Sequence, residues 1–178
     1  MDLAIMPECF IDTNLTETIS PPAGRGYNHQ KGWSSVIGQM KGKRSEDFAV
    51  GIIDKDKKST DYINEFALLQ SYNEQLELYK HTNKHHYIIY IIPAIEKFML
   101  KCADEVGVSL AEFDINFETL KELTSITKSE DTKKDPKFKC LFRELLLRQA
   151  GAIVKLARWI DYLKSNNYHA NIETLKTL

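Results

Sequence analysis

Residues 48–57 read Phe-Ala-Val-Gly-Ile-Ile-Asp-Lys-Asp-Lys, an apolar run that ends in two aspartates one residue apart. A continuous apolar run is typical of a strand that is covered on both faces, as in a parallel sheet flanked by helices. In open α/β sheets, ligands bind beyond the carboxyl ends of the strands. The stretch therefore predicts an α/β fold and places Asp54 and Asp56 at its ligand-binding edge.

Further strands and helices are expected on both sides of this stretch. Short or alternating apolar runs predict strands at residues 2–6, 27–30, 76–80 and 87–92, the last being rich in β-branched and aromatic residues. Apolar residues at helical spacing predict helices at residues 12–20, 32–40, 60–69 and 94–106. This alternation indicates a mostly parallel, Rossmann-like sheet with helices on both faces.

The C-terminal part of the sequence has a different character and contains no convincing strand. Residues 117–123 predict a helix, residues 124–135 a charged and mobile linker, and residues 136–164 a long helical region with Gly151 as its candidate break. Core packing is the default explanation for its apolar face, and a partner or dimer face is the alternative. We expect an α/β domain at residues 1–108 and a helical extension at residues 109–178 packed on it.

Composition limits the classes of function. The formal net charge is −1, so no global excess of positive charge indicates nucleic-acid binding, although local basic patches remain open. Three cysteines without CxxC spacing argue against a disulfide framework and a zinc site and favour a reducing, cytoplasmic location. The N-terminus lacks the positive region of a signal peptide, and the longest apolar run, residues 87–93, is too short to span a membrane.

Several common catalytic motifs are absent from the sequence. It has no Gly-x-x-x-x-Gly-Lys phosphate loop, no Gly-x-Gly-x-x-Gly fingerprint and no Gly-x-Ser-x-Gly elbow. These absences argue against nucleotide hydrolysis at a Walker site, dinucleotide redox chemistry and serine hydrolysis.

Acidic residues follow two of the expected strands. Glu8 and Asp12 come after the first strand, and Asp54 and Asp56 come after the central one. If these strands are neighbours, the four carboxylates converge and raise one another's pKa, which a divalent cation would relieve. Mg²⁺ prefers such oxygen ligands. Two alternatives to a metal site stay open. Each acidic turn is also typical of a solvated surface, and Asp12 is also a candidate helix N-cap.

This arrangement resembles the Toprim domain of topoisomerases, primases and overcoming-lysogenization-defect nucleases. Glu8-Cys-Phe-Ile-Asp12 is similar to the family's Glu-Gly-x-x-Asp, and Asp54-Lys-Asp56 is similar to its Asp-x-Asp after a strand. The order and spacing of strands and helices add to the resemblance, which covers about residues 1–105. Cys9 stands where the family prefers glycine, a departure that bears on catalysis more than on fold.

The resemblance implies roles for these acids. Glu8 would be the general acid/base or a metal ligand, Asp54 and Asp56 would hold Mg²⁺ or Mn²⁺, and Asp12 is a further candidate ligand. Ile92-Pro93-Ala-Ile-Glu96 is similar to a Pro-x-x-Glu segment of some small Toprim-like proteins, which makes Glu96 a weaker candidate. Basic residues near the same edge are candidates for holding a phosphodiester: Arg25, His29, Lys31 and Lys57.

The resemblance implies a nuclease-like Toprim protein that carries out Mg²⁺-dependent phosphodiester chemistry on nucleic acid. The alternative is a non-catalytic binding or assembly module, which Cys9 and the lack of a clear basic surface favour. Larger Toprim-like nucleases carry an ATPase domain and this chain has none, so a partner protein such as an ATPase is expected. A homo-oligomer is also open.

A second resemblance is confined to one segment. Phe10-Ile-Asp12-Thr-Asn14 is similar to the opening of PIN-domain nucleases, where a strand ends in Asp-Thr-Asn. PIN domains also need acids on later helices and strands, so the Toprim resemblance ranks above it.

Overall fold

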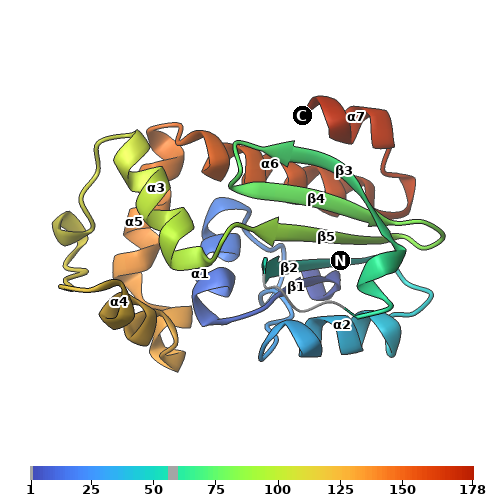
Figure 1. Cartoon of the computed structure of the whole chain (residues 1–178), viewed down its shortest axis with the longest axis horizontal. Coiled ribbons are helices and arrows are strands. Elements are labelled where there is room, and N and C mark those ends of the chain that lie inside the picture. The colour runs from blue at the N-terminus through green and yellow to red at the C-terminus, as the bar shows by residue number, and fades with distance from the viewer. Residues whose placement is uncertain (1, 56–59) are drawn as a thin grey trace.

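A mixed sheet forms the centre of the molecule in the computed structural model, which describes residues 2–55 and 60–178 (Figure 1). In these residues the sheet has the order β1-β2-β5-β4-β3. Its strands are β1 (Ile5–Pro7), β2 (Ala49–Asp54), β3 (Phe66–Tyr72), β4 (Leu76–His81) and β5 (His86–Ile91). Strand β2 pairs in parallel with β1 and β5, whereas β4 is antiparallel to β5 and β3. The predicted α/β class is confirmed, but the sheet is mixed and not mostly parallel.

The antiparallel hairpin is the main difference from the sequence prediction. Residues 60–69 were expected to be helical, but only the short 3-10 turn η2 (Ile63–Glu65) is found there before β3 begins. Asn73 and Glu74, both with positive φ, make the tight connection from β3 to β4. The helical prediction is wrong because β3 is an edge strand, where an apolar side chain such as Leu68 is 51% exposed and the alternation of buried and exposed residues is lost.

Helices cover both faces of the sheet. The helices of the described residues are α1 (Phe10–Ile19), α2 (Trp33–Lys41), α3 (Ile95–Glu105), α4 (Leu120–Thr127), α5 (Pro136–Leu147), α6 (Gly151–Asn166) and α7 (Ile172–Thr177). Short 3-10 turns complete the set: η1 (Asp2–Ala4), η3 (Leu110–Phe113), η4 (Glu130–Lys133) and η5 (Asn167–His169). Figure 1 shows α1, α3, α4 and α5 gathered beyond the end of β5 that its arrow marks.

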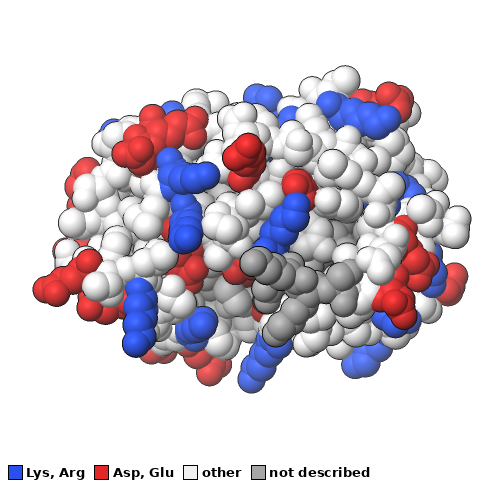
Figure 2. Space-filling model, viewed as in Figure 1, with Lys and Arg blue, Asp and Glu red and all other residues white. Residues whose placement is uncertain are grey.

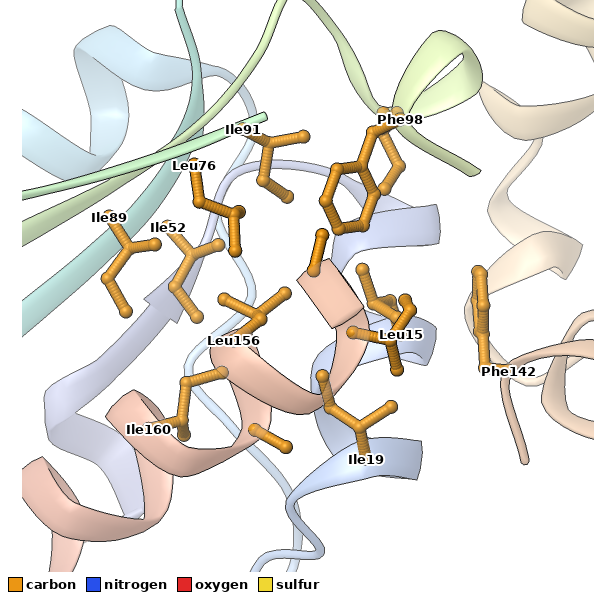
Figure 3. Close-up of a cluster of buried hydrophobic side chains, with 14 of the residues drawn as sticks. Leu15, Ile19, Ile52, Leu76, Ile89, Ile91, Phe98, Phe142, Leu156 and Ile160 are labelled. Carbon is orange, nitrogen blue, oxygen red and sulfur yellow. The ribbon is translucent and has the colours of Figure 1, made fainter. Parts of the chain in front are cut away.

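Alternate side chains of the strands enter two separate cores. Ile52 and Ile89 belong to the larger core, into which α1 and α6 also project side chains such as Leu15 and Leu156 (Figure 3). The smaller core lies on the other face and joins residues of β1, β2 and β5 to α2. The C-terminal helices α5, α6 and α7 therefore share the larger core with the strands.

The segment at residues 124–135 was expected to be a mobile linker, and this prediction is wrong. It contains the end of α4 and the turn η4. The buried Asn14 side chain of α1 donates hydrogen bonds to the carbonyl oxygens of Thr132 and Asp135, at 2.8 and 3.1 Å. The charged residues of the segment face solvent, whereas Thr127 and Thr132 are buried. The segment is therefore attached to α1 despite its polar composition.

Residues 27–30 are not a strand, although they run beside β1. The amide of Asn28 donates to the carbonyl of Ile5 and that of Gln30 donates to Pro7, at 3.0 and 2.9 Å. The chain then enters α2 through Gly32, whose φ of 94° suits glycine. These bonds place the loop that carries His29 and Lys31 next to the carboxyl end of β1.

Gly51 in β2 sets the distance between the sheet and α2. A Cβ atom at this position would lie 2.8 Å from Val36 Cγ1 and 3.4 Å from Met40 Sδ. We expect Gly51→Ala to lower the free energy of unfolding by about 1–3 kcal/mol, because overpacking forces the helix outward. Urea denaturation measures this, and a variant as stable as the wild type would contradict the close packing of α2.

Candidate functional site

Three neighbouring parallel strands each bring an acidic residue to the same edge of the sheet. Glu8 follows β1, Asp54 ends β2, and Glu96 lies in the first turn of α3, after β5. The Glu8 side chain reaches the next strand, where its Oε2 accepts a hydrogen bond from the Asp54 amide at 3.0 Å. The structure therefore places Glu8 directly beside Asp54, 46 positions away in the chain.

Backbone and side-chain donors hold the other two carboxylates of the edge. Asp54 Oδ1 accepts a hydrogen bond from the amide of Ile95 at 3.0 Å, which ties β2 to the start of α3. Glu96 is buried, and its Oε1 accepts a hydrogen bond from the Thr127 hydroxyl at 2.5 Å. The segment that the sequence analysis took for a linker thus fixes Glu96.

Asp12 adds a fourth carboxylate from α1. Its Oδ2 accepts a hydrogen bond from the amide of Cys9 at 3.1 Å, so Cys9 is the N-cap residue and Asp12 lies one turn inside the helix. Asp12 is only 1% exposed, and its Oδ1 is buried without a hydrogen-bond partner in the described residues. An orphaned buried carboxylate oxygen is costly unless a ligand satisfies it.

Burial and mutual repulsion shift the pKa values of Asp54 and Asp12. Burial raises the pKa of Asp54 to about 9, and the charges of Asp12, Glu8 and Glu96 add to the rise. Burial likewise raises the pKa of Asp12 to about 7, with contributions from Glu8 and Glu96. Burial and the neighbouring Asp12 also raise the pKa of the Cys9 thiol, which keeps it protonated and unsuited to be a nucleophile.

The carboxylates do not form a ready coordination cage. Among residues 2–55 and 60–178, no three His, Cys, Asp or Glu side chains are gathered so that they could hold a metal ion. Asp56 and Lys57, which the sequence analysis assigned to the metal and the substrate, lie outside the described residues. The described acids therefore interact electrostatically without surrounding a single point.

The basic candidates divide between two pockets. His29 and Lys31 line a pocket of about 440 Å³ together with Glu8. Arg25 lines a separate pocket of about 330 Å³ with Glu17, near the C-terminal end of α1, whereas Glu8 and Asp12 lie at its N-terminal end. The structure thus brings His29 and Lys31 to the carboxylates and not Arg25.

Two charged residues at the same pocket, Lys128 and Glu130, were not among the predicted site residues. Both lie in the supposed linker. A signal for the preceding helix was present, because Thr119 and Glu122 have the spacing of a capping box, and the Thr119 hydroxyl accepts a hydrogen bond from the Glu122 amide. Extending that helix would have carried the chain to Lys128.

The structure also bears on the PIN resemblance. The segment from Phe10 to Asn14 forms the first turns of α1 and is not the end of a strand. The local sequence match is therefore placed in a different element from the one that the resemblance requires.

No protein-family model, curated protein sequence or solved structure matches the chain. These comparisons therefore do not test the resemblance to Toprim domains. In the described part of the chain, no helix is long and apolar enough to cross a membrane.

The raised pKa values of Asp12 and Asp54 predict a pH-dependent stability. Both side chains keep a proton in the folded protein that the unfolded chain loses near pH 3.8, so their stabilisation is present below pH 4 and lost between about pH 4 and 9. Asn in place of Asp54 keeps an acceptor for the Ile95 amide but cannot ionise. In urea denaturation with chelator present, the free energy of unfolding of Asp54→Asn should increase relative to that of the wild type as pH rises over this range. A difference that is constant with pH would contradict the repulsion.

Proposed function

We propose that this chain carries out Mg²⁺- or Mn²⁺-dependent phosphodiester chemistry on nucleic acid, as a nuclease-like protein of the Toprim type. The convergence of Glu8, Asp12, Asp54 and Glu96 at the carboxyl edge of the parallel strands carries the proposal. This edge is where α/β sheets bind ligands, and sites with strongly perturbed carboxylates are often functional.

Two features of the carboxylates support a hydrated divalent cation. The unsatisfied Oδ1 of Asp12 and the repulsion on Asp54 are both relieved by positive charge. Mg²⁺ usually keeps several waters and takes only one or two carboxylates, so the absence of a described cage is compatible with it. Asp54 and Asp12 would hold the ion, with Asp56 as a further proposed ligand. When bound, the ion would supply charge stabilisation at a phosphate oxygen and a more acidic water.

The side chains around this edge have separate tasks in the proposal. The hydrogen bond from the Asp54 amide orients the Glu8 carboxylate at the rim of the 440 Å³ pocket, where it can take up or give a proton. Lys31 lines the same pocket and offers a positive charge to the phosphate. Thr127 holds Glu96 in place and so maintains the negative potential that attracts a cation.

A non-catalytic binding or assembly module is the second candidate. The observation that favours it is that each of the four carboxylates already accepts a hydrogen bond from the protein. In this alternative the acids join β1, β2, α1 and α3 structurally and bind no metal. Cys9 at the position of the family's glycine points the same way.

A cleavage assay separates the two candidates. Labelled single- and double-stranded DNA and RNA are incubated with the protein in Mg²⁺, in Mn²⁺ and in chelator. We expect cleavage that needs the metal and is lost in Glu8→Gln, which keeps an acceptor for the Asp54 amide but not the charge. Glu118→Gln, at an exposed site, is the matched control. Absence of metal-dependent cleavage of all four substrates would favour the non-catalytic module.

A further inference from the structure

The pocket beside Glu8 has features that the carboxylate chemistry does not use. Its volume is about 440 Å³, and it lies between the start of α1, the loop before α2 and the segment after α4. Glu8 and Cys9 belong both to its lining and to the carboxylate edge. A group bound in this pocket would therefore be adjacent to a phosphate at that edge.

Two aromatic rings line this pocket. Phe10 and His29 are stacked, with ring centroids 4.5 Å apart and planes inclined by 20°. Both side chains are partly exposed. Flat rings at the margin of a polar groove are the surface on which unpaired bases stack, and this contact tolerates any base sequence.

The two ring nitrogens of His29 lie in different surroundings. Nδ1 lies 2.9 Å from the Thr13 hydroxyl oxygen, which also lies 2.8 Å from the Cys9 carbonyl oxygen. Nε2 is buried without a partner in the described residues. Burial, Lys133 and Lys31 lower the pKa of His29, which keeps the ring neutral. The ring thus stacks on Phe10 as an uncharged heteroaromatic group and retains one ring nitrogen without a partner in the described residues.

Positive charge is available in the same pocket. Lys31 and Lys128 line it, and neither makes an ion pair with any residue of the described ranges. The helix α2 begins beside it after Gly32, and a helix start carries partial positive charge. Aromatic rings and unpaired ammonium groups together match a nucleotide, which has a flat base and an anionic phosphate.

We infer that this pocket binds one unpaired nucleotide of a single-stranded nucleic acid, next to the phosphate at the carboxylate edge. This inference rests on the proposed function, because it assigns the substrate class of the same site. A base inside a duplex could not reach the rings unless it left the stack. The net charge of −1 gives no overall excess of positive charge for a duplex backbone. On the face shown in Figure 2, acidic side chains are interspersed among basic ones.

Fluorescence anisotropy in chelator tests the inference without cleavage. The probes are short fluorescein-labelled oligonucleotides, as single strands and duplexes of the same sequence, in DNA and in RNA. We expect the single strands to bind at least about tenfold more tightly than the duplexes. Phe10→Leu should weaken single-strand binding by about tenfold, as loss of one base–aromatic stack does. Lys31→Gln should weaken it in a salt-dependent manner.

Matched variants control for general effects. Tyr168→Leu removes an aromatic ring that is 42% exposed on η5, and Lys43→Gln removes an exposed lysine after α2. Neither should change the affinity for single strands by more than about twofold. Circular dichroism tests whether Phe10→Leu is folded, and Lys31→Gln provides an independent test if it is not.

The outcomes separate this inference from the proposed function. Single-strand binding that depends on Phe10, in a protein that never cleaves, would support the pocket and overturn the phosphodiester chemistry. Metal-dependent cleavage would support the phosphodiester chemistry. If Phe10→Leu and Lys31→Gln both left single-strand binding unchanged in that protein, the proposed nucleotide pocket would be overturned. Equal affinity for single strands and duplexes would also overturn the inference.

Discussion

Asp54→Asn is expected to lower metal-dependent cleavage of nucleic acid by at least about 100-fold. Replacing residues one shell beyond a metal ligand typically costs 10–100-fold in activity or metal affinity, so loss of a direct ligand should cost at least as much. The variant keeps an oxygen for the Ile95 amide, which bonds to Asp54 Oδ1 at 3.0 Å, so the tie between β2 and α3 should persist. Initial cleavage rates at saturating Mn²⁺ provide the measurement.

The same variant should be more stable than the wild type in chelator at neutral or higher pH, by about 1–2 kcal/mol. Removing one of several repelling buried carboxylates relieves strain that the function requires, a known trade-off between stability and activity. Asp104→Asn, an exposed position on α3, is the matched control and should change neither quantity. A variant that is both inactive and less stable would indicate a structural role for Asp54.

Leu145→Ala is expected to lower the free energy of unfolding by about 2–5 kcal/mol, because it leaves a cavity in the larger core. Leu145 lies on α5 and is fully buried. Leu147→Ala makes the same change on the same helix at a side chain that is 75% exposed, and should cost no more than about 0.5 kcal/mol. Urea denaturation of the two variants measures the difference.

This comparison tests whether the C-terminal helices are part of the main core. In the structure, Leu145 packs in one cluster with residues of the sheet such as Ile52 and Ile89. A cost below about 1 kcal/mol for Leu145→Ala would mean that α5 is dispensable for the stability of the sheet. A single cooperative transition in both variants would agree with a shared core.

Strands β2 and β5 were predictable because their sequences are strongly constrained. The first strand, predicted at residues 2–6, begins only at Ile5, after the 3-10 turn η1. Strand β2 and strand β5 are buried on both faces, so their apolar runs are unbroken and end sharply at Asp54 and Pro93. The acidic residues after β1 and β2 were therefore visible as a pattern. Glu8 lies beside Asp54 because β1 pairs in parallel with β2. The apolar runs suggest that these strands are neighbours but do not specify this pairing.

The remaining features depend on long-range contacts that leave little trace in the local sequence. Strand β3 is an edge strand whose pairing with β4 overrides a spacing typical of helices. Asn14 fixes the segment around Thr132 through a hydrogen bond that spans 118 positions, and no local pattern reveals such a bond. The pocket around His29 likewise combines residues from three distant segments.

Isothermal titration of Mn²⁺ and Mg²⁺ into the metal-free protein tests most directly whether the clustered carboxylates share a cation. The wild type should show a saturable heat of binding that releases protons, because Asp12 and Asp54 are partly protonated at neutral pH. This heat should be absent in Asp54→Asn and retained in Asp104→Asn. A wild type that takes up neither ion at millimolar concentration, or an Asp54→Asn protein that binds as the wild type does, would contradict the account.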